Sequence, residues 1–166
     1  MDAPREQLAS ARALLATCEE RGMSLATAES LTGGMLVARL VDVPGASKVV
    51  QGGVCTYSFE AKASILGLDL ADLQARGAVR AEVASSMARA ARRVYGADVA
   101  LATTGVAGPG NDDYGNPEGL AYIAVSTPSR DLVREVRLTG SRPAIRAGVV
   151  DDAITLGFEA LTSANV

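Results

Sequence analysis

Apolar residues along the chain recur at two spacings, one typical of amphipathic helices and the other of short strands. The opening segment has the helical spacing; its apolar stripe is Leu8, Ala11, Leu15 and Cys18, with Pro4 suited to the first turn and Gly22 to the end. Apolar runs of strand length then alternate with further helical stretches. The predicted elements are strand 23–28, helix 35–41, strand 49–56 with a bulge at Gly52-Gly53, a short helix reaching Leu66, a helix capped by Asp69 that ends near Gly77, a helix followed by Gly96, strand 98–104, strands 120–127 and 132–138, and a last helix from about Pro143.

Two of the later helices have a well-defined apolar face. The expected inward residues are Val83, Met87, Ala90 or Ala91 and Val94 in the first, and Ile145, Val149, Ala153, Leu156 and Ala160 in the last. Helix and strand alternate through the first two thirds of the chain, and the last two strands form a hairpin. This order predicts one domain over 1–166: a three-layer α/β/α arrangement with a mixed, mostly parallel sheet ending in an antiparallel hairpin, on which the helix of residues 1–22 packs.

Composition and charge exclude several kinds of partner and catalytic group. The 166 residues carry a formal net charge of -3, which gives no electrostatic reason to expect nucleic acid or an anionic membrane as a partner. There is no histidine, which excludes an imidazole base, and two cysteines are too few for a structural zinc site, so we expect no metal. Cys18 and Cys55 have apolar neighbours and are expected to be buried free thiols in a cytoplasmic protein. No segment has the roughly 18 apolar residues that a membrane span needs.

Three polar clusters each follow a predicted strand, at the edge where open α/β sheets place their sites. They are TAESLTGG over 27–34, TYSFEAK over 56–62 and TTGVAGPG over 103–110. A serine nucleophile without histidine needs another base, and a lysine can serve when burial lowers its pKa toward neutrality. Ser30 precedes a Gly-Gly helix start whose free N–H groups could stabilise an oxyanion, while Tyr57 and Lys62 are spaced to face one pocket.

Each of these residues also has a simpler interpretation. Ser30 is suited to cap the following helix, Lys62 to a solvated helix surface and Tyr57 to a half-buried strand end. The glycine-rich loop of 105–119 is long for a compact domain and does not have the spacing of nucleotide-binding loops. Spacing alone therefore leaves a catalytic and a structural interpretation open.

The motifs TAESLTGG, GGVCTYSFEAKASILG and TTGVAGPG, in this order and spacing, resemble the C-terminal domain of the competence/damage-inducible protein CinA. In many bacteria that domain occurs alone as nicotinamide-nucleotide amidohydrolase. The similarity extends from about Glu6 to Leu161. It implies hydrolysis of the carboxamide of nicotinamide mononucleotide, giving nicotinate mononucleotide and ammonia in pyridine-nucleotide recycling, with no cofactor.

The resemblance also implies roles for individual residues. Ser30 is the expected nucleophile, and Tyr57 and Lys62 are expected to activate it and relay protons. Gly140-Ser141-Arg142 matches a G-D-R sequence of the family, so Arg142, with Arg146 one turn on, is the candidate for binding the substrate phosphate. The other expected substrate contacts are Thr32, Gly33, Gly34, Thr104, Gly105 and Ala107.

The chain departs from the family pattern around the expected site. Leu31 stands where cysteine is common, Phe59 where asparagine is common, and Ser141 replaces the aspartate of G-D-R. The stretch 111–119 replaces a glycine-rich stretch that leads to a turn of lysine, proline, valine and glycine, and it brings in the carboxylates of Asp112 and Asp113 and the ring of Tyr114. A negative loop near a phosphate site weakens mononucleotide binding by like-charge repulsion, so these changes bear on substrate identity.

Three functions are therefore to be separated. The first is the nucleotide amidohydrolase, the second an amidase of the same mechanism on another amide, and the third a non-catalytic ligand-binding or interaction module of the same fold. A homo-oligomer is expected because the apolar stripe of the first helix can pack on a neighbouring copy, although it can equally cover its own sheet.

Overall fold

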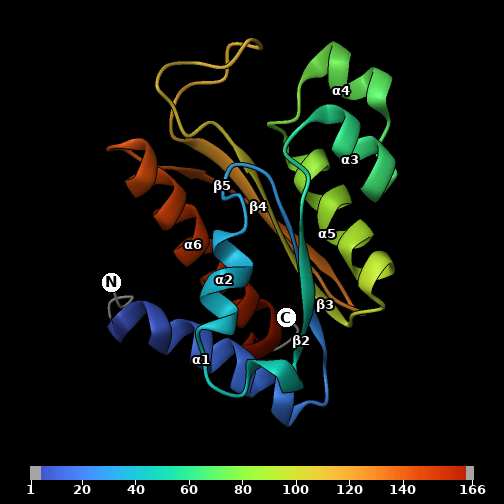
Figure 1. Cartoon of the computed structure of the whole chain (residues 1–166), viewed down its shortest axis with the longest axis vertical. Coiled ribbons are helices and arrows are strands. Elements are labelled where there is room, and N and C mark those ends of the chain that lie inside the picture. Colours follow the sequence, from blue (N-terminus) through green and yellow to red (C-terminus); the bar gives the residue numbers. More distant parts are fainter. Residues whose placement is uncertain (1–4, 164–166) are drawn as a thin grey trace.

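The computed structural model describes residues 5–163, which form a five-stranded sheet with helices on both faces (Figure 1). Pro4 and the side chain of Leu8 lie outside the described part. The strands are β1 (Leu25–Glu29), β2 (Val50–Cys55), β3 (Val99–Gly105), β4 (Leu120–Ser126) and β5 (Asp131–Arg137). The helices are α1 (Arg5–Glu20), α2 (Met35–Val41), α3 (Phe59–Leu66), α4 (Leu70–Arg76), α5 (Ala81–Tyr95) and α6 (Arg142–Thr162), with a 3-10 turn over Ala46–Lys48.

The sheet is mixed, with the strand order β2-β1-β3-β4-β5. β1 lies between β2 and β3 and runs parallel to both, whereas β4 is antiparallel to β3 and to β5. β4 and β5 form the predicted hairpin. The pairing of β1 with β2 steps from Leu25–Val50 to Ala26–Gly52, so the extra residue is Gln51, one position before the predicted glycine pair.

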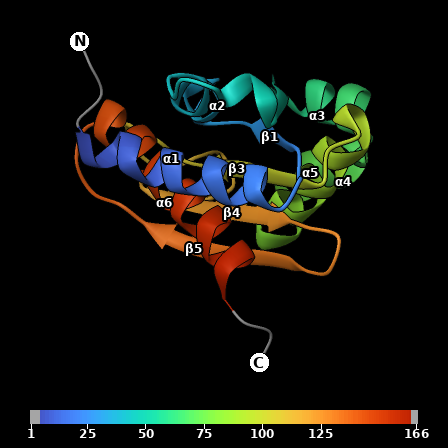
Figure 2. The same cartoon turned by 90° about the horizontal axis from the view of Figure 1, so that it is seen from below.

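The two faces of the sheet are covered by different helices, which confirms the three-layer arrangement (Figures 1 and 2). α1, α2 and α6 cover one face over leucine- and valine-rich positions that include Leu101 of β3. α5, with α3 and α4 beside it, covers the other face through alanines such as Ala90, over Ala100 and Ala102 of β3. Successive residues of β3 therefore serve opposite cores, as the alternation of side chains along a strand requires.

The predicted inward faces hold with one exception. All five inward positions of α6 are buried, but Val94 in the last turn of α5 is 50% exposed. The next residue, Tyr95, lies against Gly52 of β2. Cys18 is buried as predicted, whereas Cys55 is exposed, because β2 is an edge strand and no further strand covers it.

The described apolar stripe of α1 is covered within the same chain. Ala11, Leu14, Leu15 and Cys18 are buried, and α1 packs on α6 and α2. This removes the ground on which a homo-oligomer was expected, and self-association stays a prediction. Within residues 5–163, no helix combines the length and apolar character needed to cross a membrane.

Candidate active site

Three segments meet at the carboxyl ends of the parallel strands. The turn that follows β1 begins with Ser30, the chain after β2 enters α3, and a long loop follows β3 (Figure 1). Backbone hydrogen bonds fix these segments to one another: Ser30 N donates to Thr103 O at 3.0 Å, and Thr56 N donates to Glu29 O at 2.9 Å. The three polar clusters of the sequence therefore converge at one edge of the sheet.

Ser30 and Lys62 are in direct contact. Lys62 Nζ donates to Ser30 Oγ at 2.9 Å and to Thr56 O at 2.6 Å. The lysine side chain is buried, with 1% of its surface exposed, and this burial lowers the pKa of Lys62 from 10.5 to about 8. Its position follows from α3, which begins where Ser58 Oγ accepts from Ala61 N at 3.0 Å. In its neutral form, Lys62 can accept the Ser30 proton.

The simpler interpretations of these two residues are wrong. The N-cap of α2 is Gly34, four residues after Ser30, so the serine does not cap the helix. Lys62 is fully buried instead of lying on a solvated helix surface. A nucleophile and a base with a lowered pKa, within hydrogen-bond distance, are the minimum that serine catalysis without histidine requires.

Glu29, which the sequence reasoning missed, organises the turn that carries Ser30. Its carboxylate is fully buried and accepts from the Thr27 and Thr32 hydroxyls at 3.3 and 2.7 Å. It also accepts from three backbone N–H groups at 2.9–3.0 Å, those of Gly34, Leu36 and Val37. A negative charge at a helix N-terminus is favourable, and an acidic residue directly after the predicted strand 23–28, in the turn that leads to the predicted helix 35–41, was the available signal.

The N–H groups at the start of α2 are therefore not free to stabilise an oxyanion, contrary to the expectation from sequence. Glu29 takes those of Gly34, Leu36 and Val37. The N–H of Leu31, the residue after the nucleophile, has no hydrogen bond among the described residues. In serine hydrolases this backbone position commonly contributes to the oxyanion hole.

Ser30 and Lys62 open into a cavity of about 350 Å³. It lies between α3, the segment after α4, the start of α6 and the glycine-rich loop. The lining residues are Ser30, Leu31, Tyr57, Phe59, Lys62, Ala78, Val79, all of 104–114, and Arg142. This volume falls within the range of small-molecule sites.

Several of the expected substrate contacts line this cavity. Thr104, Gly105 and Ala107 form part of its wall, and the Thr104 hydroxyl donates to Ala78 O at 3.0 Å. Arg142 donates to Gly108 O at 2.5 Å and to the phenol oxygen of Tyr57 at 3.0 Å. Tyr57 is 63% exposed and its phenol contacts Arg142, not Ser30 or Lys62, so the structure brings only two of the three expected catalytic residues into contact.

The other expected contacts support the nucleophile turn instead of lining the cavity. Arg146 donates from Nε to Leu31 O at 2.8 Å and from Nη2 to Thr32 O at 2.9 Å, and it is not among the residues that line the cavity. Thr32 is buried against Glu29, and Gly33 and Gly34 follow it in the same turn. Their influence on a substrate would be exerted through the position of Ser30.

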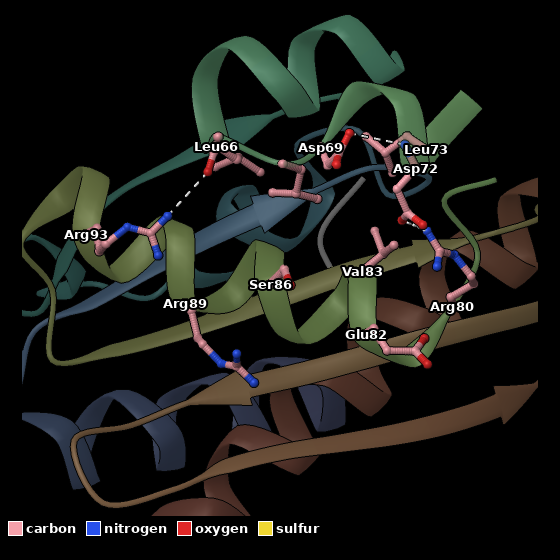
Figure 3. A pocket seen from close by; sticks show the side chains of 12 residues that line it. Leu66, Asp69, Asp72, Leu73, Arg80, Glu82, Val83, Ser86, Arg89 and Arg93 are labelled. Carbon is pink, nitrogen blue, oxygen red and sulfur yellow. Dashed lines mark hydrogen bonds and ion pairs between the residues drawn. The ribbon is translucent and has the colours of Figure 1, made fainter. Parts of the chain in front are cut away.

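A second, larger hollow of about 490 Å³ lies between α4 and α5 (Figure 3). Its arginines already have partners: Arg80 pairs with Asp72, Arg89 with Asp131, and Arg93 donates to Leu66 O. The hollow also contains Ser86, but no lysine is among its lining residues. Among residues 5–163, no group of three or more Cys, Asp or Glu side chains could hold a metal ion. The cavity at Ser30 is therefore the candidate active site.

Comparison with known proteins identifies the family of the chain. A sequence model described as the CinA C-terminal domain matches residues 7–161. The chain belongs to the CinA C-terminal domain family. CinA-like proteins of Frankia casuarinae and Geobacter sulfurreducens are each 47% identical, over 82% and 76% of this chain and 31% of their own length. The chain thus spans about a third of the length of these curated relatives.

Solved CinA structures share the whole fold. The competence/damage-inducible protein CihA of Agrobacterium tumefaciens has a TM-score of 0.91 at 33% identity, covering 98% of this chain and all of that one. A CinA superfamily protein of Klebsiella pneumoniae has a TM-score of 0.89 at 30% identity, covering 93% and 97%. The fold on which Ser30 and Lys62 lie is therefore that of a CinA domain.

Proposed function

We propose that this CinA domain is a serine amidohydrolase that converts nicotinamide mononucleotide into nicotinate mononucleotide and ammonia. The observation that carries the proposal is the contact of Lys62 Nζ with Ser30 Oγ at 2.9 Å, beneath a cavity of small-molecule size. Family membership adds the substrate, through the resemblance of the three motifs to nicotinamide-nucleotide amidohydrolase.

The reaction follows from these groups. Neutral Lys62 accepts the hydroxyl proton of Ser30 as the oxygen attacks the amide carbon. The N–H of Leu31 is available to the oxyanion that develops there. Lys62 returns the proton to the leaving nitrogen, ammonia departs, and an ester on Ser30 remains. Water, deprotonated by Lys62, then cleaves this ester and restores the serine.

The geometry favours Lys62 over Tyr57 as the group that takes the proton. Lys62 touches Ser30, while the Tyr57 phenol accepts from Arg142 at the cavity mouth. Tyr57 and Arg142 are therefore assigned to the substrate side of the site. Arg142 is the one arginine among the lining residues and the candidate for the phosphate.

The decisive experiment measures ammonia release from nicotinamide mononucleotide by the purified chain, with and without EDTA. Ser30→Ala should reduce the rate by about 10³-fold or more. Ser86→Ala, which alters the serine of the hollow between α4 and α5, is the matched control and should not change it. Hydroxylamine should intercept the ester as a hydroxamate in the wild type. A folded wild type that releases no ammonia would refute the nucleotide amidase.

A second candidate function is an amidase of the same mechanism acting on an amide without phosphate. Two observations favour it: Arg146 donates to the nucleophile turn and does not line the cavity, and the exposed Asp113 does line it. Its carboxylate would repel a phosphate dianion. Comparing kcat/KM for nicotinamide mononucleotide with that for nicotinamide riboside separates the two, and Asp113→Asn should favour the phosphorylated substrate.

A further inference from the structure

Tyr114, in the loop of 105–119 that follows β3, is held in a defined position. Asp112 accepts at its carboxylate from Tyr114 N at 3.0 Å and from Asn116 N and Nδ2 at 2.8 Å each, which closes the loop into a tight turn. The Tyr114 hydroxyl then donates to Gln74 O of α4 at 2.7 Å. The aromatic ring is thus fixed at both its backbone and its tip.

The end of α4 is shaped to admit this ring. Gly77 ends the helix with φ +75°, and a Cβ at this position would lie 2.7 Å from the ring carbon Cγ of Tyr114. A side chain at residue 77 would therefore displace the tyrosine, in addition to the strain of the backbone conformation. Gly77 and Tyr114 fit each other as a pair.

Phe59 extends the aromatic surface toward the catalytic pair. Its ring centroid is 6.0 Å from that of Tyr114, with the planes tilted by 51°. Phe59 is three residues before Lys62 on α3, so the two side chains lie on the same side of that helix. Phe59 and Tyr114 both line the cavity that holds Ser30 and Lys62.

We propose that Phe59 and Tyr114 form a ring-binding wall that selects carboxamides carried on a flat, positively charged heterocycle. A pyridinium ring gains from contact with aromatic faces through both stacking and cation–π attraction. A neutral or non-planar ring of the same size gains less. The inference rests on the proposed function and adds the residues that recognise the heterocyclic ring of the substrate.

The test uses the Ser30→Ala chain, which binds without turning over, and three ligands that differ in the ring. Nicotinamide mononucleotide has the flat pyridinium, its reduced form has the same ribose phosphate on an uncharged ring, and ribose 5-phosphate has no ring. Calorimetry should show the pyridinium form bound at least about fivefold more tightly than the reduced form. Phe59→Leu and Tyr114→Leu should remove that preference and leave ribose 5-phosphate binding unchanged.

Two further variants separate ring recognition from loop structure. Tyr114→Phe keeps the ring and should keep the preference for the pyridinium form. Gly77→Ala displaces the ring, so in the Ser30→Ala chain it should lower the preference for the pyridinium form over the reduced form. When Tyr114→Leu is already present in that chain, Gly77→Ala should not change this preference further. Circular dichroism should show each variant folded.

Equal weakening of all three ligands by the leucine variants would make the pair a structural support only and overturn the inference. An unchanged affinity for nicotinamide mononucleotide, or no binding of it at millimolar concentrations, would overturn it as well. The proposed function can fail on its own. If the wild type releases no ammonia but the ring preference still depends on Phe59 and Tyr114, the cavity is a binding site without amidase activity.

Discussion

At the scale of single residues, Lys62 is the group whose charge decides activity. With its pKa near 8, about a tenth of the lysine is neutral at pH 7, against a negligible fraction at the ordinary value of 10.5. The kcat/KM for nicotinamide mononucleotide should rise about tenfold per pH unit below 8 and level off above it. Lys62→Met should abolish the activity at every pH. Tyr57→Phe should keep the midpoint and lose far less activity, and a flat profile would contradict the assignment of Lys62 as the base.

Glu29 gives a second prediction at this scale. Replacing its carboxylate with an amide in Glu29→Gln turns one acceptor oxygen into a donor that faces other donors inside a closed network. We expect the free energy of unfolding to fall by about 2–4 kcal/mol and kcat to fall with it, because the Ser30 turn loosens.

Urea denaturation and steady-state kinetics of Glu29→Gln measure the two effects. Glu19→Gln is the control, since Glu19 forms an exposed pair with Lys48 and its change should alter stability by less than about 0.5 kcal/mol. A Glu29→Gln chain as stable as this control would show that the buried network does not depend on the charge.

At the scale of elements, the close packing of α6 predicts different effects of alanine at its two glycines, Gly157 and Gly148. A Cβ at Gly157 would lie 2.9 Å from a methyl of Leu101 and 3.1 Å from one of Leu14, both fully buried. Alanine favours the helix by about 1 kcal/mol over glycine, but overpacking between two fixed leucines should outweigh this gain. We expect Gly157→Ala to lower the free energy of unfolding by about 1–2 kcal/mol in urea titrations.

Gly148 on the same helix is the matched comparison. A Cβ there would lie 2.9 Å from a methyl of Leu138, which is only partly buried and can rotate toward solvent. Gly148→Ala should therefore be neutral or stabilising by up to about 1 kcal/mol. Two alanine variants that change stability by the same amount would show that helix propensity, not interhelical or helix–sheet contact, governs both positions.

Elements were predictable from sequence where one local pattern determines them. Helix 35–41 matches α2 residue for residue, and Asp69 caps α4 as expected, because periodicity and capping are properties of the segment itself. Errors occur where a distant segment decides. Cys55 is exposed because β2 turned out to be an edge strand. Val94 is exposed because the last turn of α5 places the half-buried Tyr95 against Gly52 instead.

The candidate site likewise combines features that a local pattern predicts with features that depend on distant segments. Ser30 and Lys62 are 32 positions apart, and no spacing rule joins them. They were placed in one site because each lies in a polar cluster that follows a predicted strand, and the family motifs then implied their roles. No local pattern indicated that Arg146 would donate to the carbonyl groups of the nucleophile turn. Both facts depend on how α6 and α3 pack against the end of the sheet, which a local pattern does not report.

At the scale of the whole molecule, burial of Lys62 favours activity because it lowers the lysine pKa, but it reduces the free energy of unfolding while the lysine is charged. The folded pKa, about 8, is below the unfolded value of 10.5, so the folded state resists holding this proton. Below pH 8 the lysine is charged in both states and the full cost of burying the charge is present. Between about pH 8 and 10.5 the folded state releases the proton first, so stability increases with pH, and above 10.5 this cost is gone.

Lys62→Met removes the buried charge and should stabilise the chain by on the order of 1–3 kcal/mol at pH 7 while abolishing turnover. The gain over wild type should shrink as pH rises toward 10.5. Lys48→Met is the contrasting control, because Lys48 is exposed and Glu19 raises its pKa, so the stability from that pair is lost as pH rises. Urea unfolding at pH 7 and near pH 10 measures both variants. A Lys62→Met chain less stable than wild type at pH 7 would mean that the charged form of Lys62 stabilises the fold. The same gain at both pH values would mean that burial does not lower the pKa of Lys62.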